Sequence, residues 1–185
     1  HLGCAAELAL GQACGPHLAD VLRGRRDPLQ LLFPGGSFEA TEPLYERTPY
    51  ARAFNAALAA AVAGIVESLP QGRSLRVLEI GAGTGGSTSA ILKVLPAGRT
   101  RYVFTDLSRL FLDRAAAKFA GYPFVEYALL DAERPFGPQG LPEHGFDVVL
   151  ASNVLHATWD LAAALGNVLE ALAPGGGVLL LEGSR

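Results

Sequence analysis

A glycine-rich segment between residues 81 and 86 is the first feature of this sequence that indicates chemistry. It follows a short apolar run and precedes residues typical of a helix. Glycines at a strand-to-helix turn let the backbone bend tightly and let a ligand lie against the main chain. Gly81, Gly83 and Gly86 also fit the G-x-G-x-x-G pattern of dinucleotide sites, a pattern that two classes of nucleotide cofactor share.

Three acidic residues accompany this turn. Glu79 lies just before the glycines, and Asp106 and Asp131 end the next two expected strands. An acid after the second strand can accept hydrogen bonds from ribose hydroxyls, and one after the third can accept from an adenine amino group. Because acids lie near three successive strand ends and the turn contains no basic residue, we expect S-adenosylmethionine rather than NAD. The alternative is that Asp106 and Asp131 only cap the segments that follow. The residues expected to bind the cofactor are Glu79, Gly81, Gly83, Gly85, Asp106, Leu107, Asp131, Ala132 and Asn153.

The elements that must position these residues alternate between strand and helix after residue 72. The expected strands are 75–80, 101–105, 124–130, 146–152 and 178–182, and the expected helices are 85–95, 108–119 and 160–172. We expect Ser108 to cap its helix and Trp159 to pack at the start of the last one. Apolar strands that alternate with helices indicate a parallel sheet covered on both faces. Ligands of such sheets bind at the carboxyl ends of the strands.

Residues 1–71 have a helical pattern and are expected to form a separate subdomain before the core at 72–185. Two short helices are expected at 4–14 and 17–24, followed by a loop at 34–43 and a long helix that opens at Pro49. The apolar stripe of the long helix is Phe54, Leu58, Val62, Ile65 and Leu69. The predicted fold class is α/β, with a Rossmann-like core preceded by an α-helical subdomain.

The composition bounds the class of protein. The chain has 185 residues, a net charge of −3, 50% hydrophobic residues and 18% charged residues. This is enough apolar material for a folded core, and the charge excludes a broad basic surface for nucleic acid. The apolar stretch at 53–66 is interpreted as too short for a membrane span, and we expect a cytoplasmic protein with no metal site. A start at His1 suggests a segment of a longer polypeptide, and the preference for Arg over Lys favours a bacterial source.

Residues 76–183 resemble the C-methyltransferase domains of modular polyketide synthases, which are class I S-adenosylmethionine-dependent methyltransferases. The similar segments are 77–86, 101–108, 146–158 and 172–176, and the run Asn-Val-Leu-His-Ala-Thr at 153–158 is the most particular. Residues 18–24 and 31–37 resemble the helical lid of this family. The resemblance implies methyl transfer to the α-carbon of a β-ketoacyl chain on an acyl carrier protein, with S-adenosylhomocysteine as product and other synthase domains as neighbours.

The resemblance also assigns catalytic roles to His156 and Glu182, because a His–Glu pair carries out the proton chemistry in this family. An α-proton between a ketone and a thioester is acidic enough for a neutral imidazole, which titrates near neutrality. A carboxylate on the other ring nitrogen would fix the tautomer and stabilise the imidazolium. Tyr45, Tyr50 and Asn55 are expected near the acyl pocket, although a structural role fits the two tyrosines equally well.

Three other interpretations stay open. A His–carboxylate pair can deprotonate oxygen as well, so an O-methyltransferase for a hydroxyl or enol is an alternative. The family's sheet has seven strands ending in an antiparallel hairpin, and the expected strands here stop at the fifth. A catalytically silent, structural domain is therefore another possibility. NAD-dependent reduction would leave Glu79 and Asp131 without a role.

Overall fold

The computed structural model describes residues 4–183 and contains two compact units, one that ends at Ala57 and one that begins at Leu58. The first unit holds α1 (Ala5–Cys14), α2 (Leu18–Leu22), α3 (Pro28–Leu32), α4 (Glu42–Glu46) and the start of α5 (Pro49–Ser68). Short 3-10 turns lie at Gly15–His17 and Pro34–Gly36. The expected division into a lid at 1–71 and a core at 72–185 stays a prediction.

Helices α3 and α4 were not expected from the sequence. Helix α3 follows the second expected helix, and α4 begins at the end of the expected loop at 34–43. Each has a proline in its first turn, where the missing N–H costs nothing. The carboxylate of Asp27 accepts a hydrogen bond from the backbone N–H of Leu29 at 2.9 Å and so caps α3. A helix of five residues is too short to produce the apolar periodicity by which longer helices are recognised.

Helix α5 opens at Pro49, as predicted, and ends at Ser68. Its 20 residues make it long and apolar enough to cross a membrane by length and composition alone. Core helices also pass such a test. Leu58 and Val62 are buried in the core of the second unit, and Ile65 and Leu69 pack against that core.

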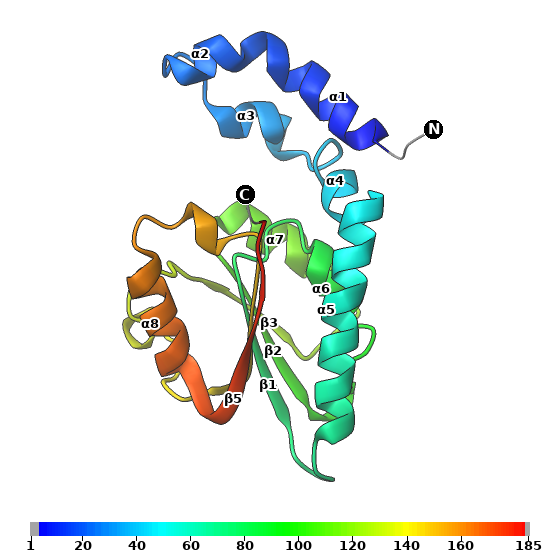
Figure 1. The fold of residues 1–185 in the computed structure, drawn as a ribbon, viewed down its shortest axis with the longest axis vertical. Helices are drawn as coiled ribbons and strands as arrows, with labels where there is room; N and C mark the ends of the chain where they lie inside the picture. The colour runs from blue at the N-terminus through cyan, green and yellow to red at the C-terminus, as the bar shows by residue number, and fades with distance from the viewer. Residues whose placement is uncertain (1–3, 184–185) are drawn as a thin grey trace. The chain divides into compact units, whose positions relative to one another are not determined.

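The second unit contains a five-stranded, fully parallel sheet in the order β3-β2-β1-β4-β5 (Figure 1). Its strands are β1 (Leu75–Ile80), β2 (Thr100–Asp106), β3 (Val125–Leu129), β4 (Phe146–Ser152) and β5 (Leu172–Leu181), and its helices are α6 (Gly86–Ile91), α7 (Arg109–Lys118) and α8 (Leu161–Ala171). Short 3-10 turns lie at Ala97–Arg99, Gly137–Gln139 and Leu155–Ala157. The predicted parallel α/β architecture is confirmed.

Both faces of this sheet are covered, and alternate residues of each central strand pack on opposite faces. In β1, Val77 belongs to the core with α6, α7 and the second half of α5, whereas Leu78 belongs to the core with α8 (Figure 1). In β4, Val148 and Val149 divide in the same way. The period of two follows from strand geometry. It explains why neighbouring positions such as 77–78 and 148–149 are both apolar.

Two local expectations were wrong. Strand β5 begins at Leu172 rather than 178, so the Pro-Gly-Gly-Gly run lies inside the strand, next to a register shift between Phe146 and Val148. Ser108 precedes α7, but within residues 4–183 its side chain makes no capping hydrogen bond. Its backbone N–H instead donates to the Asp106 carboxylate at 2.9 Å.

Candidate functional site

A cavity lies at the carboxyl ends of the strands, where the parallel sheet was expected to bind a ligand. The space inside it that a water-sized molecule can occupy is about 210 Å³, and the cavity is open to solvent. Six of the nine residues predicted to bind a cofactor line it. The lining residues are Ile80, Gly81, Asp106, Leu107, Leu130, Asp131, Ala132, Glu133, Asn153, Val154, Ala157 and Thr158.

The glycine turn is shaped by close packing as well as by backbone conformation. Gly81 has a φ of +58°, and a Cβ there would lie 2.2 Å from Val154 Cγ2. Gly85 has a φ of +74°, and a Cβ there would lie 2.8 Å from the Phe119 ring. Side chains are therefore excluded at both positions. Gly83 and Gly85 are outside the cavity lining, and their contact with a cofactor stays a prediction.

Asp106 connects the glycine turn to the residue that precedes α7. Its Oδ2 accepts the backbone N–H of Gly83 at 3.0 Å, and its Oδ1 accepts that of Ser108 at 2.9 Å. Burial raises the pKa of this carboxyl, and the backbone hydrogen bonds oppose the rise. Each carboxylate oxygen can accept more than one hydrogen bond. Asp106 can therefore hold the turn and still accept from a ligand hydroxyl.

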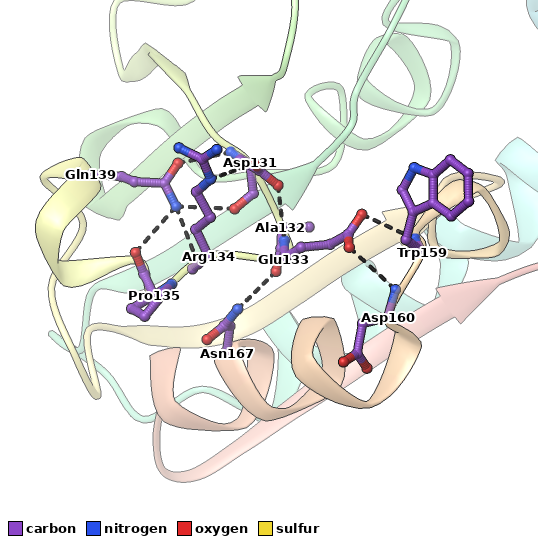
Figure 2. A network of polar contacts seen from close by, with 9 residues as sticks. All are labelled: Asp131, Ala132, Glu133, Arg134, Pro135, Gln139, Trp159, Asp160 and Asn167. Carbon is purple, nitrogen blue, oxygen red and sulfur yellow. Dashed lines mark hydrogen bonds and ion pairs between the residues drawn. The ribbon is translucent and has the colours of Figure 1, made fainter.

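Asp131 combines a local turn with a position in the cavity wall. Its Oδ1 accepts the backbone N–H of Glu133 at 3.0 Å, and its Oδ2 forms an ion pair with Arg134 Nε at 3.1 Å (Figure 2). The sequence left cofactor binding and capping alone as alternatives for Asp106 and Asp131. In the structure both residues accept local backbone N–H groups and line the cavity, and their contact with a cofactor stays a prediction.

Gln139 holds the turn that contains Asp131, and no sequence pattern indicated this role. Its amide oxygen accepts the backbone N–H of Asp131 at 2.8 Å. Its amide nitrogen donates to the carbonyl oxygens of Asp131, Arg134 and Pro135 at 3.0 to 3.1 Å (Figure 2). Asn167 of α8 donates to the carbonyl of Ala132 at 2.9 Å. The main chain at the β3 end is thus held from two sides.

Glu79 lies beneath the glycine turn, outside the cavity lining. Its side chain is buried, and Oε2 accepts hydrogen bonds from Thr88 Oγ1 and Tyr102 OH, both at 2.6 Å. Burial raises the pKa of Glu79 to about 7, against the lowering effect of these two donors. The carboxyl links β1, β2 and α6. Its predicted contact with a cofactor stays a prediction.

The structure brings together the predicted pair, His156 and Glu182. His156 Nδ1 lies 2.7 Å from Glu182 Oε2. Glu182 Oε1 accepts the backbone N–H groups of Val154 at 3.0 Å and Leu155 at 2.7 Å. The carboxylate therefore fixes both the ring and the backbone beside it. Because Nδ1 is engaged with Glu182, Nε2 is the ring nitrogen left for a substrate, and the imidazole is about half exposed.

The chain between β4 and α8 bends at Asn153 to place His156. Asn153 has a φ of +55°, a left-handed conformation that Asn tolerates better than most residues. Its backbone N–H donates to the carbonyl of Leu181 at 2.6 Å, which anchors the bend to β5. Trp159, further along, is 98% exposed, so the expectation that it packs at the start of α8 was wrong.

Tyr45, Tyr50 and Asn55 belong to the first unit. Asn55 Nδ2 donates to the carbonyl of Tyr45 at 2.9 Å, and the Tyr50 ring lies 4.3 Å from that of Phe54. Both tyrosines are exposed. The contacts of Asn55 and Tyr50 give them local structural roles, and a role of the three residues near an acyl pocket stays a prediction.

Comparison with known proteins places these features in context. Residues 78–178 match the family described as "Methyltransferase domain". The chain is 45% identical over 184 residues to the polyketide synthase ThaG of Burkholderia thailandensis, an alignment that covers 97% of the chain and 3% of that protein. The chain thus spans a small part of this relative.

Two solved structures are similar over nearly the whole chain. The CurJ carbon methyltransferase gives a TM-score of 0.96 at 43% identity, covering 99% of this chain and 49% of that one. The trans-methyltransferase CalH, in complex with SAH, gives a TM-score of 0.74 at 32% identity, covering 96% and 48%. This chain therefore spans about half the length of each solved structure.

Proposed function

This chain belongs to the methyltransferase domain family, as part of a class I S-adenosylmethionine-dependent enzyme, and we propose that it methylates the α-carbon of a β-ketoacyl thioester. The acyl chain would be carried on an acyl carrier protein, among neighbouring domains of a polyketide synthase in the cytoplasm. The observation that carries the proposal is the 2.7 Å contact between His156 and Glu182 beside the strand-end cavity. The similarity to a carbon methyltransferase favours carbon over oxygen as the acceptor.

The charges of the cavity wall suit S-adenosylmethionine. Three carboxylates, Asp106, Asp131 and Glu133, line the cavity, and none of its lining residues in the described part of the chain is Lys or Arg. Such a wall suits a cationic, hydroxyl-rich ligand, and Gly81 lets that ligand approach the main chain. When bound, the cofactor supplies an electrophilic methyl group on a positively charged sulfur.

His156 would act as the general base. With Nδ1–H donating to Glu182, Nε2 carries the free lone pair and can accept the α-proton of the substrate. The C–H electron pair would become the nucleophile for the new C–C bond, while the bond from sulfur to the transferred methyl group would break with its electron pair left on sulfur, giving S-adenosylhomocysteine. The proton would remain on the imidazole. Glu182 stabilises the resulting imidazolium and keeps the ring oriented. Holding both reactants in register supplies much of the rate.

The test is methyl transfer to a β-ketoacyl carrier protein, followed by mass spectrometry of the acyl chain. We expect His156→Ala to bind S-adenosylmethionine with the wild-type affinity and to lose turnover, with His17→Ala as a matched control. Turnover by His156→Ala would exclude His156 as the base. Transfer only to a β-hydroxyacyl chain would overturn the carbon assignment in favour of O-methylation. A wild-type protein without cofactor binding would support a structural domain instead.

A further inference from the structure

The loop that carries His156, residues 153–160, is held at both ends by carboxylates. At its start, Glu182 accepts the backbone N–H groups of Val154 and Leu155. At its end, Glu133 Oε1 accepts the N–H of Trp159 at 3.0 Å, and Oε2 accepts that of Asp160 at 3.2 Å (Figure 2). Glu182 was expected from the sequence, whereas Glu133 was not.

Glu133 and the loop it binds, residues 153–160, line the cavity from different segments of the chain. It follows Asp131 and Ala132 in the turn after β3, and Asp131 Oδ1 accepts its backbone N–H. Glu133 lines the cavity, and so do Ala157 and Thr158 of the loop. The Glu133 side chain thus joins two segments of the cavity: the turn after β3, which is expected to contact adenine, and the loop that carries His156.

We propose that Glu133 is a positioning residue, which couples occupation of the cavity to the placement of His156. The inference rests on the proposed function of that cavity. A ligand that orders the β3 turn fixes the Glu133 backbone. The Glu133 carboxylate then fixes the end of the loop through two charge-assisted hydrogen bonds, which are roughly twice as strong as neutral ones. With Glu182 holding the other end, His156 has little freedom left.

A carboxylate suits this position because two neighbouring N–H donors need two acceptor oxygens. Glutamine has the same shape but only one acceptor oxygen, and its amide NH₂ would face an N–H group. Glu133→Gln therefore keeps one of the two hydrogen bonds. At the other oxygen position, the new NH₂ group faces a backbone N–H, so two donors oppose each other. The Asp160 side chain is separate from this link, because it accepts the N–H of Ala163 at 2.9 Å inside α8.

Trp159 provides a direct readout of the loop conformation. It is the only tryptophan of the chain, and its backbone N–H donates to Glu133. The indole is 98% exposed, so its fluorescence is sensitive to ordering of the loop. The probe is S-adenosylhomocysteine, titrated into wild type, Glu133→Gln and Asp160→Ala. Calorimetry measures binding, tryptophan emission measures the loop response, and a β-ketoacyl carrier protein assay measures kcat.

We expect wild type to bind and to change its emission. Glu133→Gln should still bind the probe, more weakly than wild type because Glu133 lines the cavity, and should lose the emission change and about tenfold or more in kcat at saturating cofactor. Asp160→Ala, which weakens the same helix end without cutting the link, should keep the emission change. A wild-type emission change and a wild-type kcat in Glu133→Gln would overturn the inference. It would also be overturned if Asp160→Ala lost as much of the emission change and of kcat as Glu133→Gln. Failure of wild type to bind the probe would overturn the proposed function as well.

Discussion

The buried Glu79 should make the stability of the second unit depend on pH near neutrality. Burial raises its pKa from 4.5 to about 7. Between these values the folded protein keeps a proton that the unfolded chain has released. Because the folded state then binds more protons, the free energy of unfolding falls as the pH rises through this window. Below pH 4.5 both states are protonated, and the contribution is fully favourable.

The size of the effect follows from the two pKa values. At about 1.4 kcal/mol per pKa unit, the interval from 4.5 to about 7 corresponds to about 3 kcal/mol of unfolding free energy. Glu79→Gln is nearly isosteric and does not titrate. Its amide oxygen can still accept from Thr88 and Tyr102, whose donors lie 2.6 Å from the native carboxylate. The variant should therefore lack this part of the pH dependence.

Urea unfolding followed by circular dichroism at several values from about pH 5 to about pH 8 measures the effect. The quantity to compare is the difference between wild type and Glu79→Gln, since titration of other groups cancels in it. Wild type should lose about 2.5 kcal/mol relative to the variant across this range, because part of the effect lies below pH 5. A difference that stays constant within about 0.5 kcal/mol would refute the argument, because it would mean that Glu79 is ionised throughout.

Three further predictions concern other polar contacts and the glycine turn. Asp147 accepts hydrogen bonds from the Arg76 guanidinium at 2.9 and 3.1 Å, which lowers its pKa from 3.8 to about 2. Asp147→Asn should therefore lose about 2 kcal/mol of stability at neutral pH, and wild type should lose the same amount as the pH falls from about 4 to 2, as measured by urea unfolding. Gly81→Ala should lower the melting temperature and abolish cofactor binding, because its Cβ meets Val154, and shortening Val154 to Ala should restore only part of the loss, because φ stays positive. Gln139→Leu should weaken binding of S-adenosylhomocysteine by about tenfold or more in calorimetry, and unchanged affinity would show that the turn keeps its shape without the amide.

The sequence predicts the core of this fold well because the physical signals there are local. Apolar runs such as 75–80 and 146–152 are buried on both faces, so their ends are visible as changes of composition. Parallel strands bring their carboxyl ends together, which is why acids separated by many residues could be assigned to one site. The His156–Glu182 contact came from the resemblance, and the topology makes it possible because β4 and β5 are neighbours.

The missed features depend on contacts that only the folded chain creates. Gln139 lies in a Pro/Gly-rich loop and has no local pattern, yet its amide meets four backbone groups. Glu133 accepts from residues 26 and 27 positions away. Trp159 was expected to pack at the start of the next helix, but its ring is exposed and its backbone N–H is what Glu133 binds.

The acids of this site hold the main chain before they meet a ligand. Asp106 accepts N–H groups of the glycine turn and the approach to α7, Asp131 accepts that of its own turn, and Glu182 accepts two from the His156 loop. These bonds restrict the side-chain rotamers in the structure, so a ligand that uses the remaining lone pairs loses little further side-chain entropy. Asp106 uses both of its oxygens for backbone N–H groups, so Asp106→Asn removes a backbone acceptor as well as a charge. This variant should therefore alter the shape of the cavity wall, and an unchanged backbone in its structure would show that the charge alone matters.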